Sequence, residues 1–459
     1  MTPTLPVLIV GGGISGLVCA YELRKAGVDA HVVEAAAQPG GLIRSESRDG
    51  FLLELGPQSF SGTPALRALS SELGIGEQVA QAPASAPRYV LIDGALRSVP
   101  LSPPSFLTSS FFSARTKWKI AQDAFATTHP PEDDESVAHF VRRKFGAELL
   151  ERLVGPFVSG IYAGDPERLS LRAAFPQLYD AEQSAGSLIR GMRRAAKSRK
   201  GPRERATLMT FRGGNDTLVR ALAAKIGPAL RLGVHVLKIK MRSEPAKSKF
   251  EVRTSASGRD EIINAQNLVL ASSAGVSGAL LRDVNPAFEP VLTGVEYAPV
   301  AVVSLGYRRQ DVSNPLHGFG FLVPRSSRLQ VLGTVWNSSL FPGRAPAGHV
   351  LLTSFVGGAT NPGAITLSAQ QLGHLVHQEL VPLLQIHAEP VFSHVRIYRQ
   401  ALPQYNVGHT DRLRALERLR REISGLVLIG NYLSGPAIGN CVELAMATAE
   451  TLRNQLKSA

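Results

Sequence analysis

The chain has 459 residues, of which 44% are hydrophobic and 19% charged, and its formal net charge is +13 at pH 7. This length exceeds one compact core, so we expect a folded protein of two or three domains. No apolar run approaches the roughly 20 residues that cross a bilayer, which excludes a membrane-spanning protein, and the basic balance suits acidic partners.

The N-terminal stretch has the order strand, glycine turn, helix, strand, acid. An apolar run over residues 5–10 leads into Gly11-Gly12-Gly13-Ile14-Ser15-Gly16, apolar residues follow at helical spacing, and a second apolar run over residues 30–33 ends in Glu34. A glycine turn alone would be a weak signal. Here the strand, the helix and the acid stand where the dinucleotide-binding βαβ unit requires them.

Each part of this unit has a physical role. Gly11 permits the tight turn, Gly13 lets the backbone approach a pyrophosphate, and Gly16 lets the helix lie close to the sheet. The N–H groups at the helix start then face the phosphates. Glu34 is placed to accept the ribose hydroxyls, which disfavours a cofactor with a 2′-phosphate.

The segment after Glu34 indicates which dinucleotide is bound. It contains Gln38-Pro39-Gly40-Gly41-Leu42-Ile43-Arg44, and the glycine pair lets the chain pass close to a long cofactor. The segment resembles the extended fingerprint of FAD enzymes of the amine-oxidase type, which NAD enzymes usually lack. We therefore expect FAD.

Two strand signals follow. Residues 51–55 are typical of a short strand, and the turn Gly56-Pro57 then places Gln58 and Ser59 at its end. Either this turn lies against the flavin ring or it is a surface hairpin. Residues 88–99 predict a second hairpin around Asp93-Gly94, with Arg88 and Arg97 as its cations. The Pro- and Ser-rich residues 100–105 mark a boundary.

Residues 106–205 have a helical pattern. A cluster of large apolar side chains (Phe106, Leu107, Phe111 and Phe112) stands beside Arg115, Lys117 and Lys119. This cluster is either buried core or a surface that enters a membrane interface, and the sequence leaves both open. Residues 190–205 carry eight Lys or Arg and one acid, which indicates a solvated face or attraction to anionic lipid.

The middle of the chain contains a loop, a helix and three strands that can extend the N-terminal dinucleotide-binding unit. The loop over residues 157–166 has two glycines and an Asp-Pro turn, so it can come close to a ligand. A helix over residues 215–226 is predicted to begin at Asn215 as its N-cap. Strands are expected at residues 230–239, 249–254 and 267–271, with Val236 as a candidate for backbone contact to adenine and Ala271 closing over the cofactor.

The C-terminal half predicts a second sheet and a final helix. Strands are expected at residues 300–307, 319–323, 330–336 and 350–355, and a helix at residues 368–384. A strand over residues 426–430 leads to an apolar helix that ends near Leu452. Gly435 and Gly439 would let the N-terminus of this helix approach the flavin, where its dipole stabilises negative charge.

Cysteine and histidine give no sign of a metal or a disulfide framework. Cys19 is expected as a buried thiol in the first helix, and Cys441 is the second cysteine. His374 and His377 can share a helix face but lack a carboxylate partner, so no metal site is expected. The two cysteines fit a reducing compartment, and no secretory signal precedes the first strand. We expect a cytoplasmic protein, with peripheral contact to the membrane face left open.

Ten collinear motifs resemble the oxygen-dependent, FAD-containing protoporphyrinogen oxidases. They are GGGISGL (11–17), GGLIRS (40–45), ELGPQSF (54–60), SGIYAGDP (159–166), TFRGG (210–214), YAPVAVV (297–303), GFGFLVP (318–324), FVGG (355–358), PQYNVGH (403–409) and GNY (430–432). Most are shared with other amine-oxidase-like flavoproteins, whereas IYAGDP and PQYNVGH are more specific. The resemblance covers nearly the whole chain.

The resemblance implies an α/β (α+β) fold with three parts. A discontinuous Rossmann-like FAD-binding domain of the amine-oxidase/p-hydroxybenzoate-hydroxylase type would comprise residues 1–85, 206–275 and 425–459. A β-sheet substrate domain would comprise residues 86–105 and 276–424. Residues 106–205 would form a helical, membrane-associating domain.

It also implies the site residues. FAD would be bound by Gly11, Gly12, Gly13, Ile14, Ser15, Gly16, Glu34, Ala35, Gly41, Leu42, Gly56, Pro57, Gln58, Ser59, Val236, Ala271, Gly430, Pro436, Ala437 and Ile438. Arg88 would pair with a substrate propionate, and the tetrapyrrole pocket would be lined by Gly164, Leu322, Val335 and Phe355. No side chain is expected to act as a catalytic acid or base, because the chemistry belongs to the flavin.

The implied reaction is the six-electron oxidation of protoporphyrinogen IX by O₂ in porphyrin and heme biosynthesis. Coproporphyrinogen III is the alternative substrate, and another FAD amine or polyene oxidase is the alternative enzyme, although the aromatic fraction of 6% disfavours an amine cage. Nucleic acid is not expected as a partner, and a homodimer is left open. The chain departs from the family at Gln58, Pro436 and Asn440, which concerns the tuning of the flavin.

Overall fold

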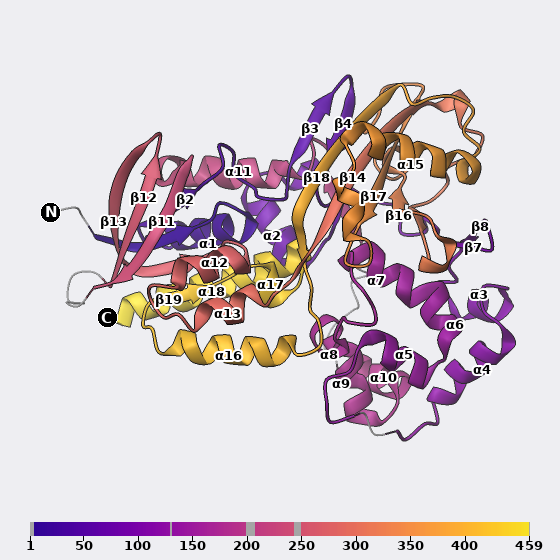
Figure 1. Cartoon of the computed structure of the whole chain (residues 1–459), viewed down its shortest axis with the longest axis horizontal. Helices are drawn as coiled ribbons and strands as arrows, with labels where there is room; N and C mark the ends of the chain where they lie inside the picture. The colour runs from indigo at the N-terminus through magenta and orange to yellow at the C-terminus, as the bar shows by residue number, and fades with distance from the viewer. Residues whose placement is uncertain (1–3, 129–130, 199–206, 243–248, 459) are drawn as a thin grey trace.

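The structure is a computed structural model that describes residues 4–128, 131–198, 207–242 and 249–458. It combines two sheets, each covered by helices, with a separate group of helices (Figure 1). Both ends of the described chain lie beside the first sheet, at the left of the view, and the helical group lies at the lower right.

The first sheet has seven strands in the order β10-β2-β1-β13-β12-β11, with β19 paired to β13. Its strands are β1 (Thr4–Val10), β2 (Ala30–Glu34), β10 (Leu230–Leu232), β11 (Val234–Met241), β12 (Phe250–Ala256), β13 (Arg259–Leu270) and β19 (Leu426–Leu428). The predicted strand over residues 230–239 is wrong in one respect. It is two strands divided at Gly233, whose φ of +68° turns the chain between them.

Alternation along β1 explains why helices cover both faces of this sheet. Val7 and Ile9 pack on one face, whereas Leu8 and Val10 pack on the other. The first face is covered by α1 (Ile14–Lys25), α2 (Pro64–Glu72), α11 (Asp216–Ile226) and α18 (Ile438–Ser458). The second is covered by α12 (Ala274–Leu281), α13 (Phe288–Thr293) and α16 (His409–Arg421).

The second sheet has the order β18-β14-β17-β16-β15-β7-β8. Its strands are β7 (Arg88–Ile92), β8 (Ala95–Ser98), β14 (Tyr297–Arg308), β15 (Gly320–Leu322), β16 (Val331–Val335), β17 (His349–Gly357) and β18 (Phe392–Pro403). The hairpin around Asp93-Gly94 and the four strands predicted in residues 300–355 are confirmed. Strand β18, whose exposed and half-buried residues show little apolar alternation, was not predicted.

One face of the second sheet is covered and the other is available to a site. Ala301, Val303 and Leu305 of β14 pack with Leu372 and Val376 of α15 (Ala369–Leu384), the predicted helix, which Figure 1 shows against these strands. Intervening residues of β14 point to the opposite face. At one end that face is covered by the hairpin of β3 (Ser45–Arg48) and β4 (Phe51–Glu54), because Phe51 stacks on Phe392 at 4.7 Å.

The remaining elements are short. A three-stranded sheet contains β5 (Phe60–Ser61), β9 (Leu208–Phe211) and β6 (Val79–Gln81), and two short helices are α14 (Asn337–Leu340) and α17 (Asn431–Ser434). Cys19 is buried in α1, as predicted, and burial raises the pKa of its thiol to about 12. Asn215 precedes α11 but does not cap it, because its side chain bonds to Thr210 and to Pro57 instead.

The predicted helical segment is confirmed. Its helices are α3 (Pro103–Thr108), α4 (Ala114–Asp123), α5 (Val137–Lys144), α6 (Ala147–Leu149), α7 (Gly155–Tyr162), α8 (Leu171–Ala174), α9 (Pro176–Ala185) and α10 (Leu188–Ser198). Phe111 and Phe112 are buried against Val90 and Ile92, so the core interpretation holds for these two side chains. The basic run continues beyond α10 into residues 199–206, which lie outside the described residues.

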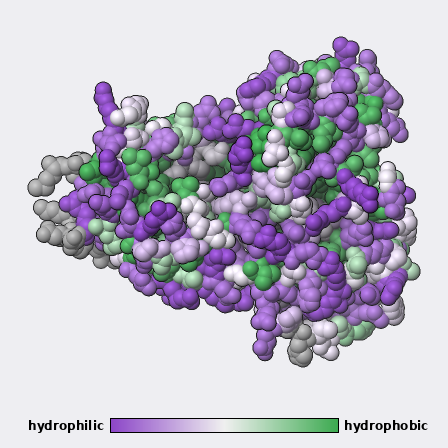
Figure 2. Space-filling view, viewed as in Figure 1, coloured by the Kyte–Doolittle hydropathy of each residue, from purple (hydrophilic) through white to green (hydrophobic). Residues whose placement is uncertain are grey.

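The surface turned to the viewer mixes hydrophilic and hydrophobic residues, and the hydrophobic ones gather mainly over the second sheet (Figure 2). None of the helices in the described part of the chain combines the length and the apolar character that crossing a bilayer requires.

Candidate functional site

The turn after β1 leaves an open space at the start of α1. A Cβ on Gly11 would lie 2.9 Å from the Ala271 carbonyl, and one on Gly16 would lie 2.0 Å from the Gly11 carbonyl oxygen, so both positions must be glycine. A Cβ on Gly13 would meet nothing within 4 Å. Gly13 precedes α1 and supplies no side-chain cap, so the first N–H groups of the helix face this space.

Two further glycine segments border the same space. The Gly40 N–H donates to the Gly12 carbonyl at 2.8 Å, and a Cβ on Gly41 would lie 3.6 Å from Gly13 Cα. A Cβ on Gly56 would lie 2.0 Å from the Leu42 carbonyl oxygen. Backbone from three parts of the chain therefore meets without side chains between, a cradle that suits an extended pyrophosphate.

Glu34 lies at this turn, at the end of β2. Its carboxylate accepts from the Gly12 N–H at 2.6 Å and from the Ala36 N–H at 2.8 Å. The Gly233 N–H donates to the Ala36 carbonyl at 3.0 Å, which brings the start of β11, and with it Val236, to the end of the sheet where Ala35 lies. The acid and the strand expected at the adenosine end of the cofactor therefore lie together.

The loop after β4 is held by hydrogen bonds from its own Gln58 and from two asparagines of other elements. Gln58 Nε2 donates to the Glu54 and Gly56 carbonyls at 2.8 and 2.9 Å, and Asn215 Nδ2 donates to the Pro57 carbonyl at 2.8 Å. Gln58 Oε1 accepts from Asn337 Nδ2 at 2.7 Å. Asn337 follows β16 of the second sheet, so the predicted flavin loop is fixed directly to the predicted substrate sheet.

A buried ion pair supports the same junction. Arg344 Nη1 lies 2.7 Å from Glu54 Oε1, and both side chains are almost wholly buried. Ser45 donates to the other carboxylate oxygen at 2.6 Å, and Arg344 also bonds to Thr210. Burial raises the pKa of Glu54 and the Arg344 charge opposes this rise. Arg344 and Asn337 were not predicted from the sequence, because neither lies in a motif and both bond to residues far away in the chain.

The C-terminal segment lies beside the first helix. Cys441 in the first turn of α18 bonds to Ser15 in the first turn of α1, so the start of α18, which Pro436 and Ala437 precede, lies near the start of α1. Gly430 and Gly435 have φ of +151° and +112°, so the chain turns sharply on either side of α17. Asn440, one of the departures from the family, donates to the Ser434 carbonyl at 2.8 Å and so shapes this loop.

The motif at residues 403–409 packs beneath α17. Tyr405 donates its hydroxyl hydrogen to the Asn431 carbonyl, and His409 Nε2 lies 3.0 Å from the Tyr432 carbonyl oxygen. Burial lowers the pKa of His409 to about 4, so its ring is neutral and its Nε2–H donates at neutral pH. The motif therefore supports the loop that leads to Pro436.

Strand register brings four predicted substrate residues onto one face of the second sheet. Leu322 pairs with Gly333, which pairs with Phe355, and these residues form one row. Gly320 pairs with Arg88 on one side and with Val335 on the other, and they form the next row. Side chains two residues apart on a strand share a face, so Arg88, Leu322, Val335 and Phe355 face the same way.

Helix α7 packs on this face. A Cβ on Gly160 would lie 2.3 Å from Leu322 Cδ2, so a larger residue here would displace the end of the Leu322 side chain. The helix ends at Tyr162, its C-cap residue Ala163 packs in a cluster with Phe355, and Gly164 follows beside Gln404. Arg88 lies over the Phe319 ring at 5.7 Å. The face is therefore mainly apolar and bounded by α7, with Arg88 near Val335 and Arg396, which pairs with Val302 beside Phe355, on β18.

Residues 14–452 match the model of the family described as flavin containing amine oxidoreductase. The chain is 35% identical over 475 residues to the chloroplastic protoporphyrinogen oxidase of Oryza sativa subsp. japonica, covering 98% of this chain and 88% of that protein. It is 29% identical to the coproporphyrinogen III oxidase of Bacillus subtilis (strain 168), with 96% of each covered. A crystal structure from Exiguobacterium sp. 255-15 superposes with a TM-score of 0.82 at 26% identity, covering 99% of this chain and 100% of that one.

Proposed function

The chain belongs to the flavin containing amine oxidoreductases and, among them, to the protoporphyrinogen oxidases, and we propose that it oxidises protoporphyrinogen IX to protoporphyrin IX. FAD is its cofactor. One observation carries the proposal: the sheet face with Arg88, Leu322, Val335 and Phe355 is joined to the glycine cradle through Gln58 and Asn337.

The glycine cradle fits FAD because it leaves room where a Cβ at Gly13 would project. Gly11–Gly16, Gly41 and Leu42 hold the pyrophosphate, and Glu34 and Val236 hold the adenosine end. The loop Gly56–Ser59 and the segment Pro436–Ile438 border the ring. When bound, FAD supplies the redox chemistry, three two-electron oxidations of the substrate in which O₂ is reduced to H₂O₂.

The residues of the second sheet hold and orient the substrate. Leu322, Val335 and Phe355 present an apolar wall to the macrocycle and exclude water from it. Arg88 neutralises a propionate at the margin of the wall. Gly164 has no side chain, so the backbone there can lie close to the substrate.

The division of labour follows the three parts of the fold. Residues 1–85, 206–275 and 425–459 bind FAD, and residues 86–105 and 276–424 bind the substrate. Residues 106–205 cover one edge of the substrate face, since Phe111 and Phe112 pack beside Leu322.

The test is turnover by the purified, FAD-loaded protein under air. Porphyrin fluorescence should rise with protoporphyrinogen IX, with about three H₂O₂ formed per porphyrin by the electron count of the reaction. Coproporphyrinogen III is the second candidate, because a relative that covers 96% of this chain carries that name. Oxidation of neither porphyrinogen, with FAD bound, contradicts the proposal.

The helical segment also contacts a membrane surface in this proposal. Leu107, Trp118 and Phe125 are 69%, 65% and 85% exposed, and Lys117 and Lys119 stand next to Trp118. Apolar side chains among cations suit the interface of an anionic bilayer. The side of this segment turned to the viewer in Figure 2 is mostly hydrophilic. Flotation with anionic vesicles tests this contact, and Trp118→Ser with Phe125→Ser should abolish it.

A further inference from the structure

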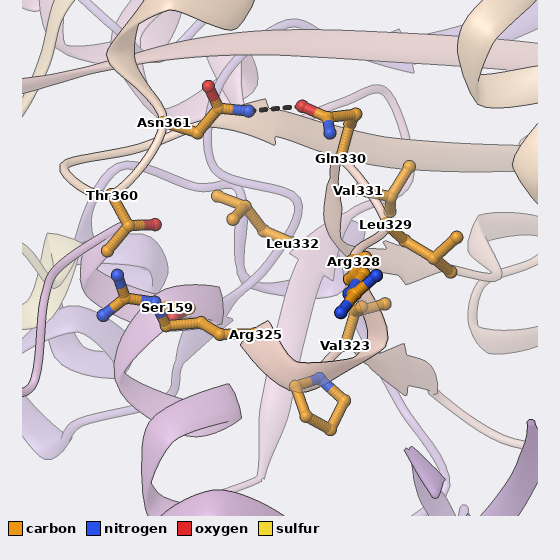
Figure 3. Close-up of a pocket in the computed structure, with 11 residues that line it drawn as sticks. Ser159, Val323, Arg325, Arg328, Leu329, Gln330, Val331, Leu332, Thr360 and Asn361 are labelled. Atoms are coloured by element: carbon orange, nitrogen blue, oxygen red, sulfur yellow. Dashed lines mark hydrogen bonds between the residues drawn. The ribbon is translucent and has the colours of Figure 1, made fainter. Parts of the chain in front are cut away.

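A polar cavity of about 210 Å³ lies at the end of the second sheet, beyond β15 and β16. Figure 3 shows the side chains around it, with Arg325 extending toward Ser159 and Arg328 on the opposite side. The residues that matter for the argument are Ser159, Arg325, Arg328, Leu332, Thr360 and Asn361. Nothing in the function described so far uses this cavity.

The lining carries positive charge and an unused hydroxyl. Arg325 is paired with Asp165 at 3.0 Å, whereas Arg328 has no ion pair in the described part of the chain. Ser159 is 2% exposed, and its hydroxyl has no hydrogen-bond partner among the described residues. A buried hydroxyl without a partner is costly, so a ligand that accepts its hydrogen bond is favoured. A cation and a hydroxyl donor together suit a carboxylate.

The cavity borders the substrate face. Leu332 lines the cavity and also packs in the cluster that contains Phe355. Ser159 is followed by Gly160, against which Leu322 packs so closely that a Cβ there would lie 2.3 Å from Leu322 Cδ2. The cavity and the substrate face therefore meet at Leu332 and at the neighbouring residues Ser159 and Gly160.

Arg88 and the cavity lie toward opposite ends of the substrate face along β15. Gly320 is level with Arg88, and β15 then runs through Leu322 to Val323, which lines the cavity. Three residues of strand span about 10 Å. A flat ligand lying on Leu322 and Phe355 would thus have Arg88 at one margin and Arg328 toward the other.

We propose that the cavity is a second carboxylate site, which takes a propionate on the side of the tetrapyrrole away from Arg88. This inference rests on the proposed function. The two propionates of protoporphyrinogen IX stand on neighbouring pyrroles, whereas coproporphyrinogen III has one on every pyrrole. Only coproporphyrinogen III reaches Arg88 and the cavity together, so the cavity determines how well this second porphyrinogen is bound.

The experiment compares Arg328→Gln with wild type as FAD-loaded enzymes on both porphyrinogens. Loss of one charged hydrogen bond should raise KM for coproporphyrinogen III about tenfold, with KM for protoporphyrinogen IX unchanged within about twofold. Ser159→Ala, a smaller change, should act in the same direction. Arg259→Gln removes an exposed arginine of the first sheet and should alter neither KM.

The second arm asks where the carboxylate comes from. Sodium propionate should inhibit coproporphyrinogen III oxidation competitively in wild type and much less in Arg328→Gln. Inhibition that does not compete with coproporphyrinogen III would mean that the cavity binds free anions, and it overturns the assignment to the substrate. Equal changes in KM for both porphyrinogens, or none, overturn it too. If the FAD-loaded protein oxidises neither porphyrinogen, the proposed function itself is contradicted, and not only the assignment of the cavity.

Discussion

Gln58 and Asn337 join the two halves of the site. Gln58 Oε1 accepts from Asn337 Nδ2 at 2.7 Å inside the protein, although 279 positions separate the two residues in the chain. Gln58 is fixed on its other side by the Glu54 and Gly56 carbonyls. These two amide side chains thus help to hold the loop Gly56–Ser59, which we assign to the flavin, against the second sheet.

Asn337→Ala should loosen this junction. The change leaves Gln58 Oε1 buried without a donor, at a cost of about 1–3 kcal/mol in the free energy of unfolding. Urea unfolding measures the loss, and the visible spectrum of bound FAD should shift because the loop beside the ring moves. Asn285→Ala removes a half-buried amide whose Oδ1 accepts from the Ala287 N–H, and it serves as the control. Equal free energies of unfolding for Asn337→Ala and Asn285→Ala would contradict the role of Asn337 at this junction.

Breaking the pair of Glu54 and Arg344 should cost more. Arg344→Met leaves a buried carboxylate without its cation, which lowers the free energy of unfolding by about 3–5 kcal/mol. Adding Glu54→Gln should restore part of this loss, because the second change removes the orphaned charge. A double variant less stable than Arg344→Met would show that the two side chains do not act as a pair.

Gly13→Ala separates cofactor binding from folding. Gly13 has φ of −73°, which alanine adopts readily, and its Cβ would touch no protein atom within 4 Å. The new methyl group would enter the space assigned to the pyrophosphate, so we expect FAD affinity to fall at least about tenfold while the Tm of the FAD-free protein is kept. Gly275→Ala, where a Cβ also meets nothing, is the matched control. An FAD affinity in Gly13→Ala equal to that of wild type would show that the pyrophosphate does not bind beside Gly13.

Arg88→Ala should act on the substrate alone. Removing a cation that pairs with a propionate should raise KM about 10- to 100-fold, with FAD content unchanged. Arg308→Ala, an exposed arginine at the far end of β14, should leave KM as in wild type. Loss of flavin during purification of Arg88→Ala would contradict the assignment.

His409 predicts a pH dependence of stability. Its folded-state pKa of about 4 lies below its ordinary value of 6.5, so between these values the unfolded chain binds a proton that the folded protein does not. Stability is therefore lost as pH falls from 6.5 toward 4, by up to about 3 kcal/mol from this group. Urea unfolding of wild type and His409→Gln across this range isolates the effect. Identical slopes in the two proteins would exclude His409 as the cause.

Local pattern was enough to predict the glycine turn with its acid and most of the regular elements. The glycines from Gly11 to Gly16, the acid Glu34 and the hairpin around Asp93-Gly94 are each defined by neighbours within a few dozen residues, so spacing alone predicts them. The strands and helices with clear apolar periods were found for the same reason. Strand β18 was missed because most of its residues are exposed or half-buried and carry no period.

Tertiary structure alone decided how the halves meet. The pairing of Gln58 with Asn337 and of Glu54 with Arg344 joins residues that no local rule connects, because buried polar groups find partners wherever the fold brings a complementary group within reach. The common face of Arg88, Leu322, Val335 and Phe355 likewise depends on strand register. Register is fixed when side chains pack, since a slip of one residue in any of the four strands would turn its member of the set to the other face.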